Sequence, residues 1–185
     1  MDIIRTEIVD GLLKRRSIRS YTDEQLSSRE IETIVQCGLW APSGRNNQTT
    51  FFSVVTDRKL LKQLQEELLE NTDNPSKWMA GSFYYNAPCV IFMYGKDDDR
   101  WSQINGGIAA ENMHIAAHSL GLGSIILGII KDFMLSDKGK KWKEILKVPE
   151  GYSFVLALAV GYVDKDSKPL PRKDGNVVYI TEDND

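Results

Sequence analysis

The chain has 185 residues, 42% of them hydrophobic, which allows one globular domain with a core of its own. Its formal net charge is -3, and its only dense basic cluster, Lys14 to Arg19, is too small for a DNA-binding face. Cys37 and Cys89 lack the paired spacing of metal or redox motifs, and no signal-like or membrane-length apolar run occurs. We therefore expect a reduced, cytoplasmic protein with no nucleic-acid or membrane partner.

The first part of the chain predicts alternating helices and strands. Apolar residues at helical spacing predict a helix over 3–13, which would deliver the basic cluster at its C-terminal end. Ser27 and Glu30 fit a capping box that opens a second helix, and Pro42 ends it. The next expected elements are a buried strand over 51–55, an amphipathic helix over 58–69 and a strand over 87–94.

An irregular stretch, residues 71–86, is richer in aromatic side chains than a plain linker. Its large side chains are Trp78, Met79, Phe83, Tyr84 and Tyr85. Two interpretations stay open here: a lid over a binding site, or a loop that tucks its rings into the core.

The second half predicts one dominant helix. Residues 104–120 are apolar or small on almost every side, which indicates a buried central helix that its neighbours approach closely. The remaining expected elements are a strand over 124–130, a helix over 138–146, a strand over 153–163 and a terminal strand over 176–181.

Three arginines and a serine are concentrated in the segment Arg15-Arg16-Ser17-Ile18-Arg19. The planar guanidinium group matches a phosphate with paired, charge-assisted hydrogen bonds. The segment therefore indicates a site for a phosphate monoester. A plainer explanation also exists, because basic side chains at a helix end offset the helix dipole in solvent.

A second polar segment, Ala41-Pro42-Ser43-Gly44-Arg45-Asn46-Asn47-Gln48, follows the second helix. Its amide and hydroxyl groups both donate and accept hydrogen bonds, as the edge of a heterocycle with alternating N–H, N and C=O groups requires. Pro-Ser-Gly with Asn is also ordinary turn chemistry. Taken together, the two segments suggest FMN.

Four segments resemble the FMN-dependent nitroreductase family, in the order that the family shows, and span nearly the whole chain. They are Arg15 to Arg19, Pro42 to Gln48, the run from Gly107 to Ser124, and Gly161-Tyr162 followed by Pro171-Arg172-Lys173. The resemblance implies an α+β fold with a central mixed, mostly antiparallel sheet flanked by helices. It also implies a single domain over residues 1–185, a C-terminal arm over 164–185 and an intertwined homodimer.

The resemblance further implies an FMN site at the subunit interface. Expected contacts to the phosphate and ribityl oxygens are Arg15, Arg16, Ser17, Arg19 and Arg172. Residues expected along the isoalloxazine ring are Pro42, Ser43, Gly44, Asn46 and Gln48, contributed largely by the other subunit. Ile126, Leu127 and Gly128 are expected to supply backbone against the ring.

The implied activity transfers hydride from NAD(P)H through FMN to a small electron-poor acceptor, such as a nitroaromatic or a quinone, by a ping-pong mechanism. The chemistry belongs to the cofactor, so no side chain is assigned as catalytic. Arg16 and Arg19 are candidates to stabilise negative charge on the reduced ring. One alternative is a protein that holds FMN without turnover, for storage or sensing.

A metal-dependent hydrolase is the other alternative, because Glu111, His114 and His118 would share one helix face. A di-iron bundle needs a second Glu-x-x-His pair, and the chain has only 2 histidines. A zincin needs Glu directly after the first His, where Ile115 stands. We therefore predict no metal site. A dinucleotide fingerprint is also rejected, since Gly121-Leu122-Gly123 follows a helix and lacks the third glycine.

Overall fold

The structure is a computed structural model that describes residues 3–73 and 75–180. Its helices are α1 (Glu7–Lys14), α2 (Ser28–Leu39), the short 3-10 helix η1 (Gly44–Asn46), α3 (Arg58–Glu70), α4 (Lys77–Gly81), α5 (Ser102–Ser119), α6 (Lys131–Leu135) and α7 (Lys140–Ile145). Its strands are β1 (Thr50–Val55), β2 (Cys89–Lys96), β3 (Gly123–Leu127) and β4 (Tyr152–Gly161).

The strands form one sheet in the order β1-β2-β4-β3, and every neighbouring pair is antiparallel. Across the middle of the sheet, Met93 of β2 pairs with Phe52 of β1 on one side and with Leu156 of β4 on the other. An isolated parallel bridge joins Ser17 to Ser124 on β3. These pairings confirm the expected α+β class with a mostly antiparallel sheet.

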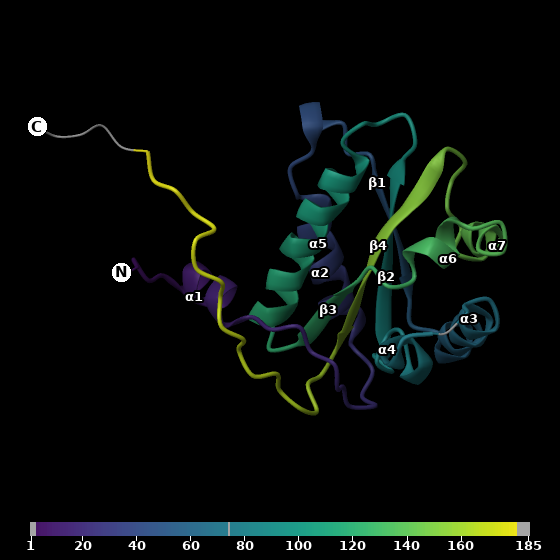
Figure 1. Cartoon of the computed structure of the whole chain (residues 1–185), viewed down its shortest axis with the longest axis horizontal. Coiled ribbons are helices and arrows are strands. Elements are labelled where there is room, and N and C mark those ends of the chain that lie inside the picture. Colours follow the sequence, from purple (N-terminus) through teal and green to yellow (C-terminus); the bar gives the residue numbers. More distant parts are fainter. Residues whose placement is uncertain (1–2, 74, 181–185) are drawn as a thin grey trace, which may run out of the picture.

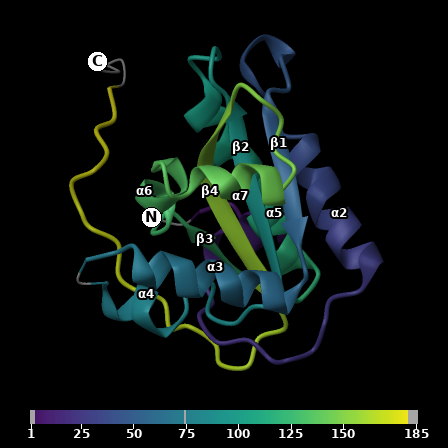
Figure 2. The same ribbon diagram turned by 90° about the vertical axis from the view of Figure 1, so that its right-hand side faces the viewer.

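Helices cover both faces of the sheet, so the fold has three layers (Figures 1 and 2). On one face α2 and α5 pack over a cluster that includes Ile34 and Met113. On the other face α3, α4, α6 and α7 pack over a cluster that includes Phe92 and Trp142. Helix α1 lies outside α5 and contributes no buried residue (Figure 1).

Local sequence signals explain the two helices that carry the site. Ser27 Oγ accepts from Glu30 N at 3.3 Å while Ser27 N donates to Glu30 Oε2 at 2.8 Å, which confirms the predicted capping box of α2. The small residues of α5 allow it to lie close to the sheet. A Cβ added at Gly106 would stand 2.7 Å from Cγ1 of Val155 on β4, so this close approach requires glycine.

Two expected strands differ from the structure. The strand expected over 124–130 ends at Leu127, and residues 131–135 form α6, which the sequence did not indicate. The strand expected over 176–181 is wrong for residues 176–180, which form no strand, while Thr181 lies outside the described residues. Val177 and Ile180 are 65% and 96% exposed. Strand-forming residues do not make a strand until a neighbouring strand satisfies their backbone groups.

The aromatic stretch 71–86 is attached to the core. Met79 and Phe83 are buried in the cluster under α3. Gln65 of α3 is also buried, and its amide donates to Met79 O and accepts from Phe83 N, both at 2.7 Å. The burial of Met79 and Phe83 agrees with the interpretation of this stretch as a loop that tucks its side chains into the core. The side chain of Trp78 lies outside what the structure describes.

After β4 the chain leaves the body of the fold (Figure 1). Residues 164–180 have no helix or strand, and nearly all of them are exposed. Within the described residues, none of the helices combines the length and the apolar character needed to cross a bilayer.

Candidate functional site

A cavity of about 270 Å³ lies where the end of α1, the turn from α5 to β3 and the start of the C-terminal arm meet. Its polar lining residues are Lys14, Arg15, Arg16, His118, Ser124 and Asp166. Three cationic side chains thus face one carboxylate. This excess of positive charge suits an anionic ligand.

Two residues of α5 lie against the Arg15 side chain, which lines this cavity. Its Nη1 lies 2.6 Å from Nε2 of His114, and its buried Nε lies 3.4 Å from Oε1 of Glu111 without a hydrogen bond. The Arg15 side chain is only 20% exposed. A guanidinium group carries five N–H bonds, so these contacts leave donors for an anion in the cavity.

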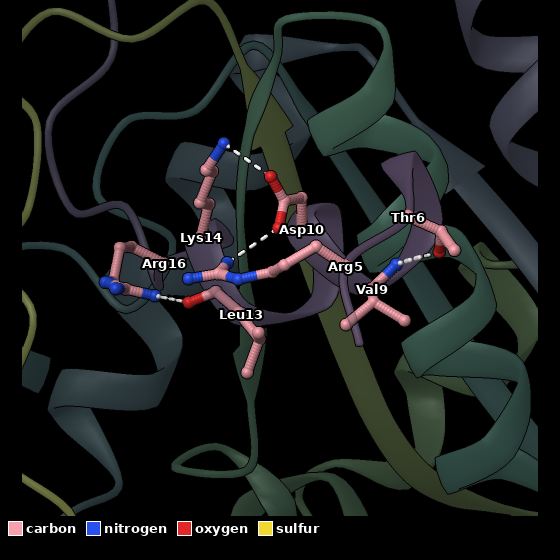
Figure 3. Close-up of polar contacts among 7 residues, drawn as sticks. All are labelled: Arg5, Thr6, Val9, Asp10, Leu13, Lys14 and Arg16. Carbon is pink, nitrogen blue, oxygen red and sulfur yellow. Dashed lines mark hydrogen bonds and ion pairs between the residues drawn. The ribbon is translucent and has the colours of Figure 1, made fainter. Parts of the chain in front are cut away.

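Lys14 and Arg16 are held by groups of α1 itself (Figure 3). Asp10 accepts from Lys14 Nζ at 2.9 Å and from Arg5 Nη1 at 2.6 Å, and these hydrogen bonds, that of Lys14 first, hold the pKa of Asp10 below its usual range. Arg16 Nη1 donates to Leu13 O at 2.6 Å. Arg16 therefore caps the C-terminal end of α1, while Lys14 is partly neutralised by Asp10.

Ser17 and Arg19 contribute to the same region in different ways. Ile18 N donates to Ser124 O at 3.0 Å beside the Ser17–Ser124 bridge, which fixes this segment against β3. Arg19 is exposed, and its Nη1 donates to Ser17 O at 3.3 Å while its guanidinium lies 6.0 Å from the ring centre of Tyr85. Neither Ser17 nor Arg19 is among the residues that line the cavity.

His114 connects Arg15 to Ser124. It is 2% exposed, and its Nδ1 makes a hydrogen bond with Ser124 Oγ. Burial, followed by the charges of Arg15 and His118, lowers the pKa of His114 to about 3. The imidazole is therefore neutral at pH 7. Its Nε2 lone pair faces a guanidinium cation, so the Glu111/His114/His118 metal alternative has no support in this geometry.

The polar loop after α2 is conformationally strained. Arg45, Asn46 and Gln48 have φ values of 55°, 55° and 52°, in the left-handed region that residues other than glycine rarely adopt. Each such residue costs about 1–2 kcal/mol. Within the loop Gln48 N donates to Ser43 Oγ at 2.9 Å, and Gln48 Nε2 donates to Asn46 Oδ1 at 3.3 Å. Strain of this kind gathers at ligand sites, where the surrounding structure maintains it.

The first turn of α5 anchors this loop. Asn105 is 3% exposed; its Oδ1 accepts from Gly44 N at 3.1 Å, and its Nδ2 donates to Asp99 Oδ2 at 2.9 Å. Thr49 Oγ1 donates to the same carboxylate, and this bond is the largest cause that lowers the pKa of Asp99. A network centred on one buried amide thus fixes the start of the loop.

The end of β3 changes from buried to open. The Leu127 side chain is 3% exposed and belongs to the core cluster that contains Phe92 and Trp142, so Leu127 offers only its backbone to a ligand. Ile126 points to the opposite face and is 38% exposed. At Gly128 an added Cβ would meet no atom within 4 Å. The strand end therefore presents Ile126 and accessible backbone.

One chain does not bring the basic cluster and the polar loop together. The loop contacts Asn105 and the cluster contacts His114, and these lie nine residues apart on α5, about 13 Å along its axis. Pro42, Ser43 and Gln48 border a separate cavity of about 80 Å³. Arg172 is exposed on the arm and does not line the basic cavity.

The sequence did not indicate two of the supporting contacts. Arg15 is held by His114, which in turn contacts Ser124. Both of these residues are distant from Arg15 in the chain, and the sequence indicated His114 only as a candidate metal ligand. Asn105 carries no sequence signal that distinguishes it from the other polar residues of α5. Hydrogen-bond partners in tertiary contact follow no regular spacing along a sequence.

Known proteins match this chain over most of its length. Residues 12–162 match the model of the Nitroreductase family. A protein of Archaeoglobus fulgidus, provisionally named an NADH dehydrogenase/NAD(P)H nitroreductase, is 32% identical over 168 residues, which are 91% of each chain. The FMN reductase (NAD(P)H) of Bacillus subtilis is 27% identical over 200 residues, with 96% of this chain and 76% of that protein covered.

Solved structures share the fold. An FMN-dependent nitroreductase from Clostridium difficile superposes with a TM-score of 0.82 at 28% identity, covering 94% of this chain and 99% of that one. A nitroreductase with bound FMN from Bacteroides fragilis gives a TM-score of 0.87 at 24% identity, covering 96% and 100%. By its sequence match and its fold, the chain belongs to the nitroreductase family.

Proposed function

We propose that this protein is an FMN-dependent oxidoreductase that uses NAD(P)H to reduce electron-poor acceptors such as nitroaromatics and quinones by a ping-pong mechanism. The observation that carries the proposal is the order of groups along β3. The cationic cavity lies at Ser124, and open backbone follows at Gly128, four residues or about 13 Å later. The names of the Archaeoglobus and Bacillus relatives support the flavin and the nicotinamide co-substrate.

The donor set at Ser124 fits a phosphate monoester. Arg15 and Arg16 supply guanidinium groups, and Ser124 supplies a hydroxyl in the same wall. A dianion that leaves water requires several charged or hydrogen-bonding partners, and planar guanidinium groups provide them in pairs. Among the residues that line this cavity, the exposed Asp166 on the arm carries a carboxylate, which is unfavourable for a phosphate.

Bound FMN would supply the redox chemistry, accepting hydride from the nicotinamide and returning it to the acceptor. The protein's residues bind and orient it. Arg15 and Arg16 hold the phosphate, and Ile126 packs against the flat ring. Asn46 and Gln48 supply amide donors and acceptors to the polar ring edge.

Arg16 and Arg19 remain our candidates for stabilising negative charge on the ring. Both guanidinium groups donate to backbone carbonyls, Arg16 to Leu13 and Arg19 to Ser17. The role requires at least one of them to leave that carbonyl and reach the ring. The Arg16→Ala variant should then keep some FMN and reduce it more slowly, and an unchanged rate of reduction would overturn the role.

A second copy of the chain would complete the site. Helix α1 has no buried residue, and its Ile8 and Leu12 are 72% and 47% exposed. On α5, Ile104 and Ile108 share one helix face and are 53% and 36% exposed. A groove of about 1020 Å³ lies between α1, α2 and α5. Apolar surface of this extent is typical of an interface, and we infer an intertwined homodimer in which the loop of one copy lies beside the end of β3 of the other, at the proposed ring position.

An anaerobic absorption spectrum tests the function. The purified protein is loaded with FMN, mixed with NADH or NADPH, and then with a quinone or a nitroaromatic. We expect the flavin band to bleach and then to return. A protein that retains no flavin would overturn the assignment of the basic cluster. Bound flavin that never bleaches would favour the storage or sensing alternative.

A further inference from the structure

Three separate elements meet at His114. Arg15 comes from the end of α1, His114 from the middle of α5 and Ser124 from β3. His114 contacts both partners through its two ring nitrogens, Nε2 at 2.6 Å from Arg15 Nη1 and Nδ1 against Ser124 Oγ. Both partners line the cationic cavity, whereas His114 does not.

The chemistry of Arg15 decides the direction of these hydrogen bonds. A guanidinium group can only donate, so Nε2 of the neutral imidazole must accept. The ring proton then resides on Nδ1, which donates to Ser124 Oγ. With its lone pair engaged by His114, the Ser124 hydroxyl directs its own proton elsewhere. Arg15 and Ser124 therefore both present donors to the cavity.

The charged groups around His114 maintain this state. Arg15 faces it from α1, and His118 and Glu111 lie one helical turn away on α5. Burial, followed by the charge of Arg15, lowers the pKa of His114 to about 3, so the neutral ring persists through the physiological range. An imidazolium would direct a second N–H at the guanidinium and lose the hydrogen bond that Nε2 accepts from Arg15.

We propose that His114 is a positioning residue for the phosphate end of the cofactor, which orients Arg15 and Ser124 toward the phosphate as the Nδ1-protonated tautomer without touching it. The inference rests on the proposed FMN function. Loss of His114 should therefore weaken only the binding of the phosphate group, because the segments proposed to bind the ring lie at the other end of β3 and on the loop anchored by Asn105.

Riboflavin, which lacks the phosphate, makes the test specific. Dissociation constants for FMN and for riboflavin are measured by flavin fluorescence with the wild type and with His114→Leu, Ser124→Ala and His114→Gln. We expect His114→Leu and Ser124→Ala to weaken FMN binding on the order of 10-fold and to leave riboflavin binding unchanged. His114→Gln restores an acceptor for Arg15 and should regain much of the loss. Met113→Leu, a buried neighbour on α5, controls for perturbation of the core.

The outcomes separate this inference from the proposed function. A wild type that binds neither flavin overturns the function itself. If the wild type binds FMN more tightly than riboflavin and His114→Leu shows the same ratio of affinities, only the role of His114 is overturned. Equal weakening of FMN and riboflavin would also overturn it, because that is the result of a purely structural role.

Nitrogen-15 NMR of the imidazole rings gives a readout that needs no folded variant of His114. The chain has 2 histidines, and His118→Asn assigns their signals. We expect one ring to be neutral at pH 7 with its proton on Nδ1. An Nε2-protonated or doubly protonated His114 would contradict the proposed hydrogen-bond direction.

Discussion

The backbone of Ser17 pairs with that of Ser124 in a parallel bridge, although the two residues lie in opposite halves of the chain. Gly123 makes this possible, since a Cβ there would stand 2.8 Å from side-chain carbons of Ile18 and Val163. The bridge attaches the basic segment to the edge of the sheet. The proposed phosphate and ring positions therefore lie on one strand.

Arg15→Ala should weaken FMN binding about 10- to 100-fold, because it removes charge-assisted hydrogen bonds to the phosphate. Titration of apoprotein with FMN measures the effect. Arg29→Ala removes the same charge from an exposed site on α2 and serves as the control. Equal affinities of the two variants would contradict the placement of the phosphate.

Asn105→Ala should lower the melting temperature by about 3 to 10 °C, because Gly44 N loses its acceptor and the Asp99 carboxylate loses one of its donors. We also expect slower reduction of bound flavin, since the strained loop loses its anchor. Calorimetry and stopped-flow absorbance measure the two effects. Gln103→Ala, on the exposed side of the same helix, should change neither.

His114 should make the stability of the protein sensitive to acid. Its pKa is about 3 in the folded protein and near 6.5 in the unfolded chain. The unfolded state therefore binds the proton first, and the free energy of unfolding falls as pH decreases from about 6.5 to about 3, by up to about 1.4 kcal/mol per pH unit. Above pH 6.5 the stabilisation that results from burying His114 in its neutral form is fully present.

Urea unfolding at pH 7 and pH 5, at one protein concentration, measures this dependence. The His114→Gln variant cannot titrate and should lose less stability than the wild type between the two values. Identical losses would show that other groups account for the acid sensitivity.

Ile8→Asp should shift the protein from dimer to monomer, because a carboxylate would enter the apolar surface that α1 exposes. We also expect weaker FMN binding, since the loop would come from the second copy. Analytical ultracentrifugation measures the assembly. Ile145→Asp, on α7 at the opposite face of the sheet, should remain dimeric. A monomeric wild type that binds FMN tightly would contradict the shared site.

Most helices and strands were predictable because their signals are local. The sequence predicts the capping box at Ser27 and Glu30 and the close packing of α5 through its small residues, and both are present in the fold. The short helix α6 was missed, since five residues carry too little periodicity to reveal a helix. The segment 176–180 has strand composition without a partner strand, and pairing is not encoded in composition.

The candidate site was only partly accessible to the same reasoning. Arg15, Arg16 and the loop from Pro42 to Gln48 were identifiable by the chemistry of their side chains. The support of Arg15 by His114, and of the loop by Asn105, depends on contacts between distant segments. Arg19 matches the motif but does not line the cavity, which only the tertiary structure shows.

The sequence by itself determined most of the elements, the family resemblance and the polar groups available for a flavin phosphate, because these depend on neighbouring residues and on side-chain chemistry. Tertiary structure decided which groups meet. Packing of α5 on the sheet placed His114 between Arg15 and Ser124, and it separated the basic cluster from the polar loop by about 13 Å of helix. That separation follows from close packing of whole elements, which sets distances between residues that no local pattern relates.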